Sequence, residues 1–124
     1  MNSSPLEYLR TLVAGVPALD SALNRCLQSW GAETPPATIA FAEVGDAITE
    51  NLAALPNEAR QKIFAAVEEG MVSQDSALRT AMATGLVEAL VASADKKPNL
   101  WIEFESLLGV ASLKHATAWR NFGR

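Results

Sequence analysis

The segment from residue 38 to 55 has two opposite faces when it is wound as an α-helix. Five large apolar side chains recur at helical spacing and share one face: Phe41, Val44, Ile48, Leu52 and Leu55. Three carboxylates, those of Glu43, Asp46 and Glu50, share the other face at positions i, i+3 and i+7. A helix of this kind has to bury one side against other elements, and it leaves a negatively charged side for solvent or a partner.

Helical periodicity recurs along the whole chain, and no segment shows the alternation typical of a strand. Ala and Leu are abundant while β-branched and aromatic residues are sparse, which also favours helix. The first helix is predicted to begin at Pro5, and the others cover about residues 17–30, 38–55, 58–70, 75–94, 100–108 and 112–122. We therefore predict an all-α protein, a single domain over residues 1–124, folded as an irregular bundle of six to seven helices. A short HEAT-like array of helical hairpins is the alternative.

Residues with known preferences mark several helix ends. Ser4 and Glu7 form a capping box around Pro5, the first helical residue. Gly31 is expected to end the second helix, and Ser112 is expected to cap the last one.

The charge distribution limits the kinds of partner. The net charge is −4, and no Lys or Arg occurs from Cys26 to Ala59, so the chain lacks the basic face that nucleic-acid binding needs. Cys26 is the only cysteine; we expect it to pack as a small apolar residue, in a protein from a reducing compartment. Because no apolar run reaches 18 residues, we expect a soluble cytoplasmic protein that does not span a membrane.

Residue types that carry catalysis are scarce. One His and one Cys cannot make a zinc site, and carboxylates on one straight helix seldom converge on Mg²⁺ or Ca²⁺. Phosphate-binding loops and the nucleophile elbow are missing from the sequence. We therefore predict no enzyme activity, no catalytic residue, no cofactor and no metal.

Three further residues are candidates for a site. Glu88 lies on a predicted helix that is apolar nearly all round, so its carboxylate needs an ion pair, a helix end to cap, or a functional role. His115 shares a face with Trp119 at i+4, and is expected to be packed and hydrogen-bonded; the alternative is a contact residue whose charge changes near neutral pH. For Trp119, as for Trp30 and Trp101, core packing is expected, with an interface anchor as the alternative.

Two short segments carry a family resemblance. Residues 85–90 read Gly-Leu-Val-Glu-Ala-Leu, and residues 107–112 read Leu-Leu-Gly-Val-Ala-Ser. This pair of segments resembles a family of small bacterial helical proteins similar to the immunity proteins of toxin systems. The resemblance covers roughly the last forty residues, and Val110 stands where that family has proline. It implies an all-helical cytoplasmic protein whose partner is a protein, and it brings no catalytic residue.

Three kinds of function remain on this basis. The first is an immunity protein, or antitoxin, whose acidic residues Glu43, Asp46 and Glu50 cover a basic surface of a cognate toxin. The second is a small-ligand-binding or enzymatic domain with a pocket near Glu88. The third is an accessory protein that self-associates, for example as a homodimer.

Overall fold

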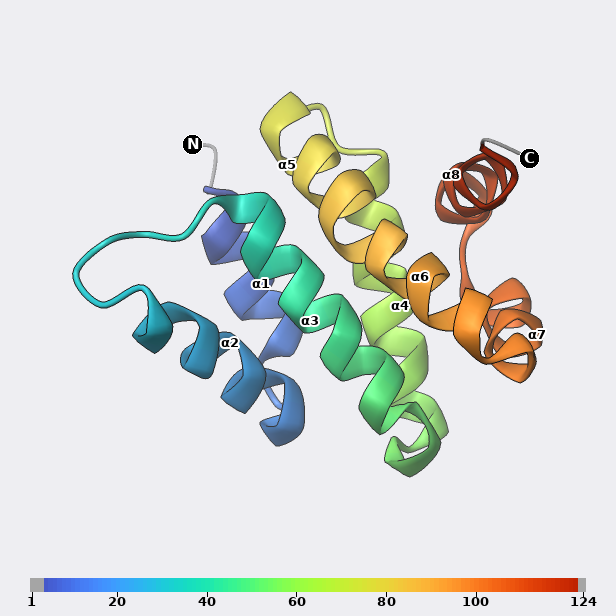
Figure 1. Ribbon diagram of the computed structural model, residues 1–124, viewed down its shortest axis with the longest axis horizontal. Helices are drawn as coiled ribbons and strands as arrows, with labels where there is room; N and C mark the ends of the chain where they lie inside the picture. Colours follow the sequence, from blue (N-terminus) through green and yellow to red (C-terminus); the bar gives the residue numbers. More distant parts are fainter. Residues whose placement is uncertain (1–3, 123–124) are drawn as a thin grey trace.

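The computed structural model describes residues 4–122, and within them the secondary structure is entirely helical, which confirms the predicted all-α bundle (Figure 1). The helices are α1 (Pro5–Val13), α2 (Pro17–Ser29), α3 (Ala37–Asn51) with a short 3₁₀ turn η1 (Leu52–Ala54), α4 (Asn57–Met71), a long helix composed of α5 (Ser76–Thr80), η2 (Ala81–Val87) and α6 (Glu88–Lys96), and then α7 (Pro98–Leu107) and α8 (Val110–Asn121).

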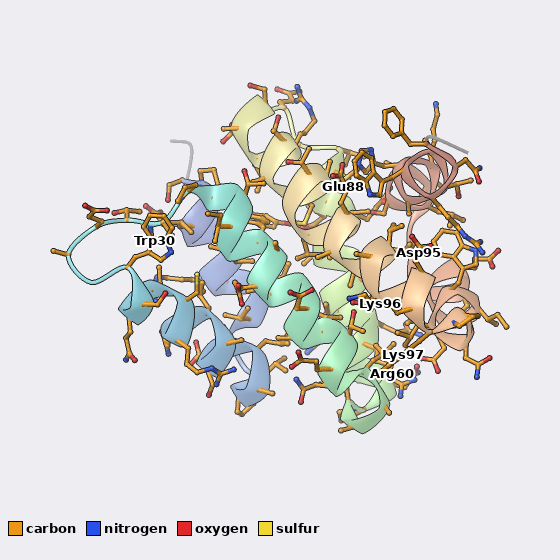
Figure 2. The ribbon with its side chains drawn as sticks, viewed as in Figure 1. Trp30, Arg60, Glu88, Asp95, Lys96 and Lys97 are labelled. Atoms are coloured by element: carbon orange, nitrogen blue, oxygen red, sulfur yellow. The ribbon has the colours of Figure 1, made fainter. Side chains whose placement is uncertain are left out.

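The ends of the early helices follow from local chemistry. The Ser4 hydroxyl oxygen accepts a hydrogen bond from the Glu7 backbone N–H at 3.2 Å, so α1 begins where the capping box predicts. Gly31 follows α2 with a φ of +60°, a left-handed conformation that glycine adopts without strain. At the far end of α3, Arg60 Nε donates to the carbonyl oxygens of Leu52 and Leu55 at 3.0 and 3.1 Å (Figure 2). Arg60 therefore supplies donors to carbonyl groups that the end of α3 leaves free at the corner into α4.

Helix α3 is the centre of the bundle. It packs against α1, α2 and the long helix, while α4 lies behind it and contacts α1, α7 and α8 (Figure 1). Its fully buried residues include Phe41, Val44 and Ile48, as the apolar stripe predicts. Because one helix contacts several non-sequential neighbours, the core is shared across the bundle rather than divided between successive hairpins.

The long helix crosses the core as one continuous rod. Ser76–Lys96 is 21 residues long and is apolar enough to pass the length and composition criteria for a membrane span. Half of its most apolar window is buried inside the protein, and a core helix of a packed bundle meets the same criteria. Its middle third, η2, is wound as a π-helix and carries the buried side chains of Met82 and Leu86.

Two glycines bring α3 and η2 unusually close. A Cβ placed on Gly85 would lie 2.7 Å from Phe41 Cβ and 2.7 Å from the Thr38 carbonyl oxygen. A Cβ on Gly45 would lie 2.8 Å from the Leu86 carbonyl oxygen. Since these neighbours are backbone or next to backbone, the two helices can cross at this distance only with glycine at both positions.

The three tryptophans have different environments. Trp101 is buried, and the Arg120 guanidinium lies 4.4 Å from its ring centroid. Trp30 is half-buried. Trp119 is 41% exposed and stacks on the exposed ring of Phe122, with centroids 5.5 Å apart. The prediction that Trp119 packs in the core is therefore wrong, because its position near the end of α8 leaves the ring at the surface beside Phe122.

Candidate functional site

The three predicted carboxylates lie together in a hollow between α2 and α3, which we call the acidic groove. Its volume is about 370 Å³, and Glu43, Asp46 and Glu50 line its α3 side. The α2 side contributes Arg25, Cys26, Ser29 and Trp30. Trp30 lies at the C-terminal end of α2, near the loop that leads to α3 (Figure 2). The sequence predicted the acidic face, and the packing of α2 against α3 makes it concave.

Burial and the neighbouring carboxylates of the acidic groove both disfavour ionisation of Asp46. Partial burial raises the pKa of Asp46 above its ordinary value, and the negative charges of Glu43 and Glu50 raise it further. Lys96, from the end of α6, opposes this and lowers it. The upward shift thus reflects loss of hydration first and the neighbouring carboxylates second, and a cation close to Asp46 would favour its ionised form.

Cations do approach the groove in the folded protein, although none occurs in the sequence from Cys26 to Ala59. Arg25 reaches it from α2, and Lys96 is near enough to influence Asp46. Among residues 4–122, however, no Lys or Arg nitrogen lies within 4.0 Å of these carboxylates. Glu43, Asp46 and Glu50 are therefore flanked by cations but are not neutralised by direct ion pairs.

Cys26 is buried in the wall of this groove and is a free thiol, which confirms its predicted packing role. Burial raises the pKa of the Cys26 thiol, and the negative charge of Glu43 raises it further. A thiol in this environment is a poor nucleophile at neutral pH.

Glu88 and His115, two separate candidates in the sequence, form a pair in the structure. Glu88 Oε2 lies 3.0 Å from His115 Nε2, and the side chains are 17% and 31% exposed. The contact joins Glu88, the first residue of α6 (Figure 2), to His115 in the middle of α8. Glu88 thus has the partner that its predicted burial required, while neither the acidic groove nor the hollow between α1 and α4 includes it.

Replacing Glu88 by Ala is expected to lower the free energy of unfolding by about 1 to 2 kcal/mol, because His115 would lose its charged partner in a half-buried site. Urea denaturation of Glu88→Ala, His115→Ala and the double variant measures the coupling between them. The exposed Glu105→Ala is the control, with an expected change of about 0.5 kcal/mol or less. Strictly additive effects of the two substitutions would show that the pair is not energetically coupled.

A carboxylate that the sequence did not single out holds the start of α8. Glu68, on α4, accepts hydrogen bonds from the backbone N–H groups of Ala111 and Ser112, both at 2.9 Å, and from the Ser112 hydroxyl at 2.7 Å. Ser112 is fully buried in the first turn of α8, and the N-cap residue is Gly109. The prediction that Ser112 caps the last helix is therefore wrong, because a side chain from another helix satisfies these N–H groups.

The electrostatics of Glu68 agree with this role. Burial by itself raises the pKa of the Glu68 carboxyl, but the hydrogen bonds from Ala111 and Ser112 favour the ionised form and bring the pKa below its ordinary value. Glu68 and Ala111 are 43 positions apart, and no spacing rule connects residues at that separation. The only sign of Glu68 in the sequence is that it stands directly before a second glutamate, Glu69.

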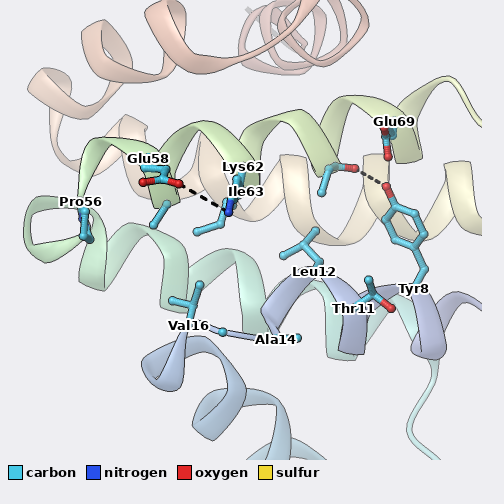
Figure 3. A pocket seen from close by; sticks show the side chains of 13 residues that line it. Tyr8, Thr11, Leu12, Ala14, Val16, Pro56, Glu58, Lys62, Ile63 and Glu69 are labelled. Carbon is cyan, nitrogen blue, oxygen red and sulfur yellow. Dashed lines mark hydrogen bonds and ion pairs between the residues drawn. The ribbon is translucent and has the colours of Figure 1, made fainter.

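A second hollow, which we call the α1–α4 cleft, was also not predicted. It has a volume of about 420 Å³ and lies between α1 with its following turn and α4, along which it extends from the N-cap Pro56 to Glu69 (Figure 3). Tyr8, Thr11 and Glu69 are among its polar residues, and Leu12 and Ile63 are among its apolar ones. Burial raises the pKa of the Tyr8 hydroxyl, and the nearby negative charge of Glu69 raises it further.

The described part of the chain contains no group of three or more His, Cys, Asp and Glu side chains placed to hold a metal ion.

Comparison with known proteins gives a family and no function. Residues 9–123 match a domain family described as a domain of unknown function, DUF7674. No curated protein and no solved structure matches the chain. Because the match covers almost the whole sequence, the chain belongs to the DUF7674 family.

Proposed function

We propose that this protein is a non-enzymatic binding protein that recognises a basic surface of a protein partner through the acidic groove. The observation that carries the proposal is the placement of Glu43, Asp46 and Glu50 along one wall of a hollow without direct cationic partners. A basic side chain entering the groove would meet three carboxylates and would offset the effect of Glu43 and Glu50 on Asp46. Trp30 would offer an aromatic surface to the same cation.

The partner we propose is a bacterial toxin with a basic active-site surface, so that the protein acts as its immunity protein. The acidic groove would bind the cationic surface that the toxin uses on a negatively charged substrate, and would block it. The resemblance of the segments around Glu88 and Ser112 to helical immunity proteins supports this form of the proposal. Long-range attraction between the opposite charges would also speed the association.

The test measures association of the purified protein with the product of the adjacent gene at two ionic strengths. We expect that Glu43→Lys, Asp46→Lys and Glu50→Lys combined will slow association by about tenfold or more at low salt, and less at high salt, because steering is lost or reversed. The fold is expected to persist, since these side chains lie opposite the buried face of α3.

The matched control reverses three exposed carboxylates elsewhere, with Glu33→Lys, Glu103→Lys and Glu105→Lys combined, which changes the net charge by the same amount. A control that slows association as much as the groove variant would show that only net charge matters. Equal rates for the wild type and the groove variant would contradict the proposal and direct attention to the exposed Trp119 and Phe122 on α8. An adjacent gene product that is harmless to cells lacking this protein would contradict the immunity form alone.

A further inference from the structure

The α1–α4 cleft has the volume and the apolar lining of a small-molecule site. Its volume of about 420 Å³ falls within the range of about 300 to 1,000 Å³ that is usual for ligand pockets. Leu12 and Ile63 contribute apolar surface from opposite helices, and Val16 and Pro56 add apolar surface at one end (Figure 3). An apolar body of several carbon atoms would therefore be buried against aliphatic side chains.

The polar groups of this cleft point to a hydrogen-bond donor. The Tyr8 hydroxyl gives its only proton to the Ala66 carbonyl oxygen at 2.6 Å, so it has only lone pairs left for another group. The Thr11 hydroxyl likewise donates to the Glu7 carbonyl oxygen at 3.2 Å. The carboxylate of Glu69 lies close to the Tyr8 hydroxyl (Figure 3). The Tyr8 hydroxyl oxygen and the Glu69 carboxylate are thus two neighbouring acceptors, which a cationic donor would satisfy.

The charges at the other end of the cleft cancel. Lys62 Nζ and Glu58 Oε1 are 3.7 Å apart, so this pair is close to neutral, and the carboxylate of Glu69 remains as the unbalanced charge. Lys62 and Glu69 are seven residues apart on α4, which is roughly 10 Å along a helix. The neutralised Lys62–Glu58 pair is thus about two helical turns away from the Glu69 carboxylate.

We propose that the α1–α4 cleft binds a small amphipathic primary amine, with the ammonium group beside the Glu69 carboxylate and the Tyr8 hydroxyl oxygen and the hydrocarbon against Leu12 and Ile63. This site is separate from the acidic groove, which lies between α2 and α3. A lysine side chain of a peptide carries the same ammonium group on a shorter hydrocarbon chain. The experiment therefore has to distinguish a free amine from a peptide lysine.

The test is a titration of the isotopically labelled full chain followed by amide chemical shifts, with n-hexylammonium as the probe. We expect saturable shifts at Ala14, Gly15 and Ala59, which line the cleft. Glu69→Gln should weaken binding by about fivefold or more, because the charged partner of the ammonium becomes neutral. The control Glu105→Gln, at an exposed position on α7, should leave the affinity unchanged.

Two probes of matched length separate charge from hydrophobicity. We expect n-hexanol to bind several-fold more weakly than n-hexylammonium, and n-hexanoate to bind more weakly still. Equal binding of hexanoate and hexylammonium, or an unchanged affinity in Glu69→Gln, would overturn the proposal. Linear, non-saturating shifts with hexylammonium would also overturn it.

The source of the amine is decided by a fourth probe, Nα-acetyl-lysine methylamide. We expect it to bind more weakly than hexylammonium. Its peptide groups would either enter the apolar end of the cleft or stay outside, and in the second case only the four-carbon lysine side chain would be buried. Tighter binding of the lysine derivative would overturn the assignment to a free amine.

Discussion

Replacing Gly85 by Ala is expected to lower the free energy of unfolding by about 3 kcal/mol, because the added methyl group has no room between α3 and η2. The new Cβ would lie 2.7 Å from both Phe41 Cβ and the Thr38 carbonyl oxygen, and neither atom can rotate away. Helices α3 and η2 would have to separate, which would open the contact at the centre of the core. Urea denaturation followed by far-UV circular dichroism measures the loss.

The control for Gly85→Ala is Thr84→Ala, on the exposed side of the same turn, with an expected change of about 0.5 kcal/mol or less. Gly45→Ala should also be destabilising, because its Cβ would meet the Leu86 carbonyl oxygen at 2.8 Å. The double variant Gly45→Ala, Gly85→Ala should cost less than the sum of the single effects, since one separation of the helices relieves both clashes. An unchanged denaturation midpoint for Gly85→Ala would mean that the two helices do not cross this closely.

Replacing Glu68 by Ala is expected to lower the free energy of unfolding by about 2 to 3 kcal/mol at neutral pH, because three hydrogen bonds to an ionised carboxylate are lost at the start of α8. The buried Ser112 N–H and hydroxyl would lose their acceptor at the same time. The neighbouring exposed carboxylate provides the control, and Glu69→Ala should change the stability by about 0.5 kcal/mol or less.

The effect of Glu68 also has a defined pH dependence. Since the folded protein holds the pKa of Glu68 below its unfolded value of about 4.3, its contribution is complete above that pH and is lost as the pH falls through the folded pKa. The stability difference between the wild type and Glu68→Gln should therefore be largest near neutral pH and should shrink in acid. A difference that stays constant from pH 7 to pH 3 would contradict the capping role.

Most of the helical segmentation could be predicted from the sequence because its causes are local. The Ser4 cap and the stop at Gly31 depend on residues within one turn, and Gly31 has the predicted left-handed φ. The buried stripe that contains Phe41 and Ile48 depends only on the 3.6-residue period. The acidic face of α3 follows from the same period.

The errors and omissions concern contacts between distant residues. Local rules favour Ser as a helix cap, so the sequence predicts Ser112 as the cap of the last helix. In the structure the acceptor for the backbone N–H of Ser112 is Glu68, on another helix. The pairing of Glu88 with His115 needed the relative placement of α6 and α8. Trp119 was expected in the core because aromatic residues usually are, and only the placement of the end of α8 in the fold leaves it exposed. The function as an immunity protein and the cytoplasmic location remain predictions.

The sequence by itself determined that this chain is helical, where most helices begin and end, and which face of α3 is acidic, because each of these depends on neighbours within a few residues. Only the tertiary structure decided that α2 closes against that face to make the acidic groove, that Gly45 and Gly85 let α3 and η2 touch, and that α1 and α4 leave a cleft between them. These features are set by how side chains of non-sequential helices fill the space between them, and periodicity contains no information about which helices become neighbours.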